Sequence, residues 1–174
     1  MKFFGKIELY TGEGKGKTTA AAGLTLRMIG NGYNALFVQF MKSRPSAEVV
    51  MLESCGKEKF RLMRHWDGSF VTEEPTGSQI AMCRTLWQKF QEELKESDCN
   101  LLVLDEVVVA VSYGLIEEED LLRFLDAKPS DLEVVMTGRG ASDALVEASD
   151  LVTEMRKIKH YYDRGVMARK GIEY

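Results

Sequence analysis

The sequence predicts an α/β fold in which a mainly parallel sheet is covered by helices on both faces. Short runs of β-type residues alternate along the chain with longer helical stretches. The first run ends in a glycine-rich turn that opens a helix. A later run, at residues 100–104, is continuously apolar after Asn100, as expected of a central strand buried on both faces.

The composition is that of a globular protein. The chain has 174 residues, of which 45% are hydrophobic and 29% charged, and it contains only 3 prolines. This length fits one domain over residues 1–174. Lys and Arg number 23 against 27 Asp and Glu, which gives a net charge of -4. Such a balance lacks the basic footprint of a nucleic-acid binder, so no nucleic-acid partner is expected.

Cysteine and histidine usage argues against disulfides and metal clusters. Cys55, Cys83 and Cys99 are an odd number without a CxxC pair, and we expect reduced, mostly buried thiols. His65 and His160 lie far apart, with no neighbouring cluster of acids or cysteines. Apolar runs of about 18 residues and a signal peptide are both missing, so we expect a cytoplasmic protein without a membrane partner.

The first half of the chain alternates strands and helices. Residues 6–10 form the first predicted strand, and the Ala-, Leu- and Met-rich stretch 17–30 is a helix. A second strand is expected at 34–40, after turn residues. Ser46 is a plausible N-cap for a short helix that ends at Ser54, and a further strand is expected at 60–63.

A long loop and the most regular helix follow. Residues 65–77 show no clear period and are predicted to form a lid loop. Apolar residues then recur at three- and four-residue steps over 78–97, which predicts a helix with one buried face. After the strand at 100–104, residues 107–113 fit a strand by propensity or a helix by context.

The remaining elements complete the sheet. A helix is predicted at 117–127, a strand at 131–137 and a short helix at 142–148. A last strand at 151–158 closes the sheet, and residues 159–174 form a polar C-terminal tail.

The strongest functional signal lies between the first strand and the first helix. The segment Tyr10–Thr19 is typical of a P-loop, whose backbone N–H groups converge on a phosphate at a helix N-terminus. Lys17 would add a charge and Thr18 a magnesium-binding hydroxyl. The loop is one residue shorter than usual, and the alternative is a glycine turn with a chance Gly-Lys-Thr. The predicted ATP-binding residues of this segment are Thr11, Gly12, Glu13, Gly14, Lys15, Gly16, Lys17, Thr18 and Thr19.

A Walker B arrangement supports this interpretation. Four apolar residues at 101–104 precede Asp105 and Glu106, and a carboxylate at the end of a neighbouring strand can reach magnesium directly or through water. The alternative is that the two acids cap the next helix. Together the motifs predict a three-layer P-loop NTPase (RecA-like) fold with ATP and Mg²⁺ as ligands and Thr18, Asp105 and Glu106 around the metal.

Other basic residues flank this edge of the sheet. Arg139 lies between two glycines after a predicted strand, where either a phosphate contact or an ordinary turn with a solvated arginine would fit. Lys15 lies inside the P-loop itself. For Lys42 and Arg44, which follow the second strand, we favour solvated loop charges.

The motifs resemble the P-loop ATP:corrinoid adenosyltransferase family almost end to end. The similar segments are the shortened loop at 11–20, the second-strand motif at 38–42, Leu104–Glu106, Thr137–Gly140 and the C-terminal run 159–174. The resemblance implies that cobalt(I) of a corrinoid attacks the 5′-carbon of ATP and the whole triphosphate leaves. ATP would lie reversed relative to hydrolysing P-loop enzymes, with its terminal phosphate deepest in the loop.

The resemblance also implies roles for particular residues. Lys17, Thr18 and Glu106 would orient ATP and stabilise the departing triphosphate, with no general base from the protein. Arg27, near the nucleotide end of the first helix, is a further ATP-binding candidate. Family members use aromatic residues of a lid to remove the lower cobalt ligand, and here Trp66 and Phe70 are the candidates, because Val71 replaces the usual tryptophan.

The implied partners are a corrinoid substrate, a second copy of the chain in a homodimer and a candidate flavoprotein reductase. The pathway would be adenosylcobalamin biosynthesis or salvage. Two alternatives stay open at this point: an ordinary P-loop ATPase or phosphotransferase, supported by the two Walker motifs alone, and a catalytically inactive ATP- and corrinoid-binding module, supported by the altered lid.

Overall fold

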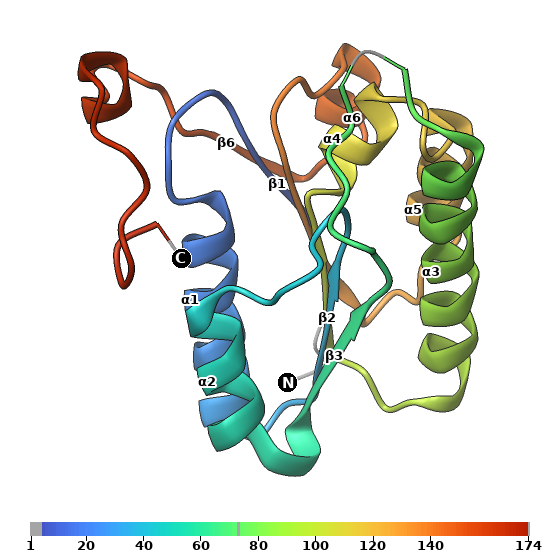
Figure 1. The fold of residues 1–174 in the computed structure, drawn as a ribbon. Coiled ribbons are helices and arrows are strands. Elements are labelled where there is room, and N and C mark those ends of the chain that lie inside the picture. Colours follow the sequence, from blue (N-terminus) through green and yellow to red (C-terminus); the bar gives the residue numbers. More distant parts are fainter. Residues whose placement is uncertain (1–4, 73, 174) are drawn as a thin grey trace.

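The computed structural model describes residues 5–72 and 74–173, and these form a six-stranded, all-parallel sheet with helices on both faces (Figure 1). The strand order is β3-β2-β4-β5-β1-β6. In chain order the elements are β1 (Ile7–Thr11), α1 (Lys17–Gly30), β2 (Ala35–Gln39), α2 (Ala47–Gly56), the 3-10 turn η1 (Lys57–Lys59), β3 (Phe60–Arg64), α3 (Gly77–Glu96), β4 (Leu101–Asp105), α4 (Val107–Ser112), α5 (Glu118–Ala127), β5 (Glu133–Thr137), α6 (Asp143–Glu147), β6 (Leu151–Glu154) and η2 (Tyr161–Arg164).

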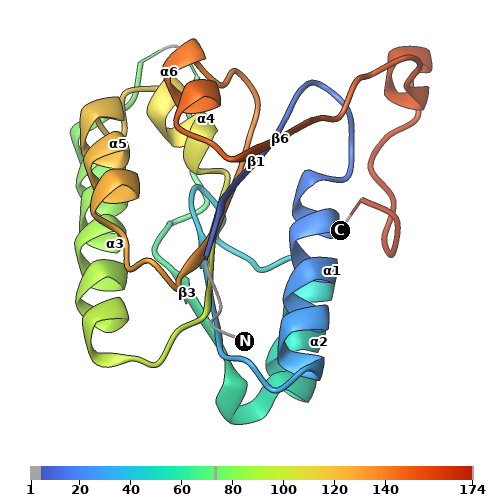
Figure 2. The ribbon, with the colours of Figure 1, turned by 180° about the vertical axis from the view of Figure 1, so that it is seen from behind.

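The molecule has three layers, which confirms the predicted fold class. Helices α1 and α2 cover one face of the sheet, and α3 and α5 cover the other (Figures 1 and 2). A core lies on each side. Leu9, Val38 and Leu104 point towards α3 and α5, whereas Phe37 and Val103 pack against α1 and α2. The alternation of adjacent residues between the two cores is the period-two geometry of a strand buried on both faces.

The predicted elements all occur, with two points resolved by packing. Residues 107–113, which fitted either type, contain the helix α4, because the chain turns at Glu106 with φ 63° and leaves the sheet. The last strand ends at Glu154 rather than at Ile158. Beyond Glu154, the Met155 N–H donates to Thr11 O and the Met155 carbonyl accepts from Gly14, so the chain bends over the loop after β1.

The order of the strands corrects one expectation about the site. The acids that end β4 were expected on a neighbour of β1, but β5 lies between these two strands. A contact from β4 to the first residues of α1 must therefore pass over the end of β5, which is Thr137.

The expectation of mostly buried, reduced thiols is met only in part. All three cysteines are free, but Cys55 is exposed, and only Cys83 is fully buried. Burial raises the pKa of the Cys83 thiol to about 12.

Within the described ranges, no helix combines the length and apolar character that a membrane span needs.

Candidate nucleotide-binding site

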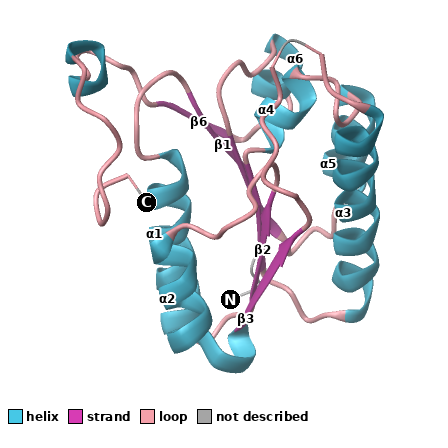
Figure 3. Ribbon diagram, in the orientation of Figure 1, coloured by secondary structure: helices cyan, strands magenta, loops and turns pink. Residues whose placement is uncertain are grey.

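The loop after β1 surrounds the Lys17 side chain. Figure 3 shows the loop that joins β1 to α1. Gly16 is the N-cap of α1, and Lys17 is the first helical residue. The Lys17 ammonium donates to the carbonyls of Gly12 and Gly14 at 2.6 and 2.7 Å. Burial lowers the pKa of Lys17, and the nearby Arg139 charge lowers it further. The loop thus holds a desolvated cation at the positive end of a 14-residue helix.

Glycine is required in this loop because another part of the chain lies against it. A Cβ on Gly14 would lie 2.4 Å from the Met155 carbonyl oxygen, which also accepts the Gly14 N–H. Any side chain at this position would therefore push away the segment that follows β6. The absence of a side chain at Gly14 thus lets the backbone at Met155 pack closely on the loop that is predicted to bind phosphate.

Asp105 is the centre of a buried hydrogen-bond network below the loop. Its carboxylate is fully buried and accepts from Thr18 Oγ1 at 2.8 Å and from Thr137 Oγ1 at 2.7 Å. Gln39 Nε2 donates to the other oxygen at 2.9 Å, and the Lys42 ammonium donates to it at 2.7 Å. Side chains from the ends of β2 and β5 and from the start of α1 thus meet at the last residue of β4.

Glu106 lies beside this network and faces the cavity. Its left-handed backbone conformation is unusual for a residue other than glycine, and its N–H is anchored on Thr137 Oγ1 at 2.9 Å. Burial and, secondarily, the Asp105 carboxylate raise the pKa of Glu106, whereas the Lys42, Lys17 and Arg139 charges oppose that shift. The strained turn aims a carboxylate at a group of cations.

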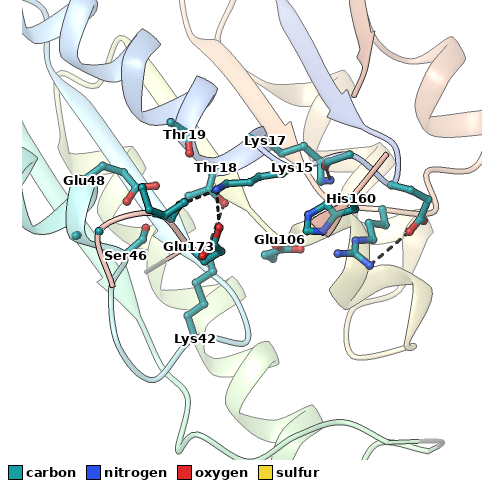
Figure 4. A pocket seen from close by; sticks show the side chains of 17 residues that line it. Lys15, Lys17, Thr18, Thr19, Lys42, Ser46, Glu48, Glu106, His160 and Glu173 are labelled. Carbon is teal, nitrogen blue, oxygen red and sulfur yellow. Dashed lines mark hydrogen bonds and ion pairs between the residues drawn. The ribbon is translucent and has the colours of Figure 1, made fainter. Parts of the chain in front are cut away.

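The loop, the Walker B residue and the C-terminal tail enclose a cavity of about 580 Å³ (Figure 4). Figure 4 shows the side chains of Lys15, Thr18, Lys42 and Glu106 around this space. The lining comprises residues 13–19 of the loop, Lys42, residues 46–48 at the start of α2, Glu106, Arg139, His160 and residues 171–173.

The tail docks on the loop through Lys15. The Lys15 ammonium donates to Tyr161 Oη at 3.1 Å and to Ile172 O at 2.8 Å. It also pairs with Glu173 Oε1 at 3.0 Å, a contact drawn in Figure 4. Arg169 stacks over the Tyr161 ring and also pairs with Glu173. Arg169, followed by Tyr161, depresses the pKa of Glu173. His160 and residues 171–173 of the tail thus form one wall of the cavity.

The structure brings most of the predicted ATP-binding residues together. Glu13 to Thr19, Glu106 and Arg139 line the cavity, while Asp105 lies beneath it. Thr11 ends β1 and Gly12 follows it, just outside the lining. Arg139 pairs with Glu13 at 3.4 Å, and both side chains are exposed. Arg27 lies in the last turn of α1 and is not among the lining residues.

The lid candidates share a loop outside that lining. Phe70 is 90% exposed, whereas Trp66 packs partly against the core and donates its indole N–H to Ser69 O at 2.9 Å. Gln79, buried at the start of α3, donates to Ser69 Oγ and to Phe70 O. Glu73, within the predicted lid, and Tyr174, at the end of the tail, lie outside the described residues.

Several site residues escaped prediction. Lys42, which we interpreted as a solvated loop charge, is ion-paired to Asp105. Thr137 and Gln39 had no assigned role, although both lie at the carboxyl ends of strands. Position at a strand end, the argument that singled out Asp105, was the available signal for all three. The docking of Tyr161 and Glu173 had no comparable signal.

The oxygen donors fit a magnesium ion. Thr18 Oγ1 and Asp105 Oδ1 are hard oxygen ligands 2.8 Å apart, and Glu106 faces the same cavity. In the part of the chain that is described, no group of three or more His, Cys, Asp or Glu could hold a metal. Magnesium bound by so few protein ligands completes its shell with substrate phosphates and water.

The fold and the site define a P-loop nucleotide-binding protein. A similar fold occurs in the cytoplasmic domain of EssC, with a TM-score of 0.56 and 18% sequence identity over 95% of this chain and 34% of that one. A family model described as ATP:corrinoid adenosyltransferase BtuR/CobO/CobP matches residues 4–174. The chain belongs to this family.

Curated relatives agree with the family assignment. The corrinoid adenosyltransferase of Escherichia coli is 37% identical over 174 residues, which cover 98% of this chain and 86% of the relative. Corrinoid adenosyltransferase CobA of Salmonella typhimurium is 37% identical over 171 residues, with the same shares covered. A corrinoid adenosyltransferase of Pseudomonas aeruginosa is 34% identical over 178 residues, 98% of this chain and 84% of that protein.

Proposed function

We propose that this protein transfers the 5′-deoxyadenosyl group of ATP to the cobalt(I) of a corrinoid and releases triphosphate, in adenosylcobalamin biosynthesis or salvage. The supporting observation is a cavity in which Lys42, Glu106 and the P-loop with its two lysines surround one space, in a chain that matches the adenosyltransferase family over residues 4–174. The proposed domain spans residues 1–174, with a lid at 65–77 and the C-terminal tail at 159–174.

The proposed reaction needs positioning and charge stabilisation rather than proton transfer. The cobalt(I) electron pair forms the bond to C5′, the C5′–O bond breaks, and the triphosphate leaves with that bond's electrons. Cobalt is thereby oxidised to cobalt(III). Because the nucleophile already has an available electron pair, the protein's task is to align C5′ and to stabilise the negative charge on the leaving group.

Each site residue has a part in that task. Lys17 and the N-terminus of α1 would hold the terminal phosphate, since the ammonium and the helix dipole point into the loop. Arg139 and Lys15 would bind further phosphate oxygens after leaving Glu13 and Glu173. Thr18, Asp105 and Glu106 would hold magnesium, which supplies positive charge to the triphosphate when bound.

The remaining elements of the proposal rest on the family resemblance. Trp66 and Phe70 would displace the lower ligand of a cobalt(II) corrinoid, and a flavoprotein reductase would supply the electron. A homodimer and a cytoplasmic location belong to the same proposal. Phe70 is available for such a contact because its ring is exposed.

The test is a product analysis. Purified protein is incubated with ATP, Mg²⁺ and chemically reduced cobalamin, the light-sensitive cobalt–carbon product is followed by absorbance, and the phosphate product is identified by ³¹P NMR. The proposal expects equal amounts of the product and tripolyphosphate. Release of inorganic phosphate without the cobalt–carbon product would favour an ordinary ATPase, and tight corrinoid binding without turnover would favour an inactive binding module.

A further inference from the structure

Lys42 places a positive charge next to Thr18 of the P-loop and Asp105 of the Walker B motif. Its ammonium lies 2.7 Å from Asp105 Oδ2 and 3.3 Å from Thr18 Oγ1. The side chain comes from the segment directly after β2 and extends towards Thr18 in Figure 4. Only 25% of the Lys42 side chain is exposed, and Asp105 is not exposed at all.

Asp105 depends on Lys42 for charge compensation. The other donors to its carboxylate are the Thr18 and Thr137 hydroxyls and the Gln39 amide, all of them neutral. Among the described residues, Lys42 is the cation that forms an ion pair with Asp105. A fully buried carboxylate without such a partner is strongly destabilising, so this pair is a requirement of the folded resting state.

The Lys42 ammonium lies where a divalent ion would bind. Thr18 Oγ1 and an Asp105 oxygen are hard donors at the start of α1 and the end of β4, and the Lys42 ammonium is in contact with both residues. A lysine ammonium and a divalent ion repel each other strongly at such distances in a partly buried site. The two cations cannot share this position.

We propose that Lys42 is the resident cation of the nucleotide-free site, a positioning residue that occupies the divalent-ion position and leaves it when the metal arrives with the nucleotide. This inference rests on the proposed nucleotide site but goes beyond it. Lys42 lowers the affinity of the resting site for a free divalent ion, so metal and nucleotide enter together. Once displaced, the ammonium is within the cavity lining and can pair with a phosphate oxygen.

The experiment uses Mn²⁺ as the probe and contains neither nucleotide nor corrinoid. Free Mn²⁺ is measured by electron paramagnetic resonance during titration of the wild-type protein, Lys42→Met and the charge-conserving control Lys42→Arg. We expect Lys42→Met to bind Mn²⁺ at least about tenfold more tightly than the wild type, because the competing cation is gone. Lys42→Arg should bind as weakly as the wild type. Equal Mn²⁺ affinity in Lys42→Met and the wild type would overturn the proposal.

A double variant separates charge competition from structural damage. Lys42→Met should melt at a lower temperature than the wild type and should be stabilised by added Mg²⁺, whereas the wild type should not respond. Adding Asp105→Asn removes the uncompensated charge, so the double variant should recover melting temperature and lose the gained Mn²⁺ affinity. Retained tight Mn²⁺ binding in the double variant would contradict the proposed competition between Lys42 and the metal.

The wild-type protein alone provides a further check that does not depend on any variant folding. Nucleotide-free wild type that binds Mn²⁺ in the micromolar range would refute the role of Lys42. None of these measurements uses the transfer reaction. The inference on Lys42 can therefore fail while adenosyl transfer is observed, and the proposed function can fail while Mn²⁺ binding follows the expectation.

Discussion

Replacing Thr137 with valine tests the buried network directly. Thr137 is fully buried at the end of β5, where its hydroxyl donates to Asp105 and accepts from the Glu106 N–H. Valine has nearly the same shape, so the change removes the two hydrogen bonds without opening a cavity. The perturbation isolates a side chain that bonds to both Walker B acids from the end of β5, the strand between β1 and β4.

The expected loss follows from the two bonds. A hydrogen bond to a charged group contributes about 1.5–3 kcal/mol, and one to a neutral amide contributes about 0.5–1.5 kcal/mol. Their sum predicts that Thr137→Val lowers the free energy of unfolding by about 2–4.5 kcal/mol. Asp105 keeps three other donors, which places the loss below the cost of removing Lys42.

Urea denaturation at neutral pH measures this difference. The midpoint should fall while the slope stays unchanged, because the same surface is exposed on unfolding. Thr137→Ser is the matched control: it keeps the hydroxyl, loses one methyl group and should cost about 1 kcal/mol. A valine variant within about 0.5 kcal/mol of the wild type, or a serine variant as unstable as valine, would refute the account of Thr137 as a bridging residue.

Three further perturbations address the loop, the lid and a carboxylate pair. Lys17→Ala should weaken ATP binding in calorimetry by at least about tenfold, because it removes a charged donor at the helix N-terminus. Phe70→Ala should slow adenosylation that starts from a cobalt(II) corrinoid and spare assays that start from cobalt(I). Burial, with a contribution from the Glu8 carboxylate, raises the pKa of Glu133 to about 7. Because the folded-state pKa exceeds that of the unfolded chain, the stability that protonated Glu133 contributes is lost as pH rises from about 5 to about 8. Glu133→Gln cannot titrate, so its melting temperature should fall less than that of the wild type over this pH range.

Each of these has an outcome that contradicts it. Unchanged ATP affinity in Lys17→Ala would argue against a P-loop role for the lysine. Equal loss in both corrinoid assays would argue against a lid role for Phe70, whose exposed ring should make the variant as stable as the wild type. A steeper decline with pH in Glu133→Gln than in the wild type would contradict the sign of the pKa shift.

Local patterns in the sequence were sufficient for the two Walker motifs and for the elements other than α4 and the two 3-10 turns. A glycine-rich turn between a strand and a helix predicts where a phosphate binds, and an apolar run ending in acids predicts where a carboxylate emerges. Both predictions concern residues close together in the chain. Asp105 and Thr18, which these patterns place at the same edge of the sheet, are joined by a hydrogen bond of 2.8 Å.

Long-range partners could not be predicted in this way. Nothing in the sequence indicates that β5 separates β1 from β4, and this separation makes Thr137 a bridging residue. The last strand ends at Glu154 because Met155, which still donates to Thr11 O, turns its carbonyl towards Gly14, a residue about 140 positions away in the chain. Lys42 was misjudged because its partner, Asp105, is 63 residues away.

The pairing of the site's cations has a consequence for nucleotide affinity. Lys15 is held by Glu173, Lys42 by Asp105 and Arg139 by Glu13, while Lys17 is held by loop carbonyls. A triphosphate therefore does not meet free charges but exchanges protein partners for phosphate oxygens. Only the difference between the old and the new contacts contributes to affinity, so the resting ion pairs limit the binding of ATP while holding the cations close to where they act.

The exposed pair of Arg139 and Glu13 costs least to break, and the buried pair of Lys42 and Asp105 costs most. On the proposal for Lys42, the most costly exchange is then the one in which the metal would replace the ammonium, which would compensate the loss of this pair.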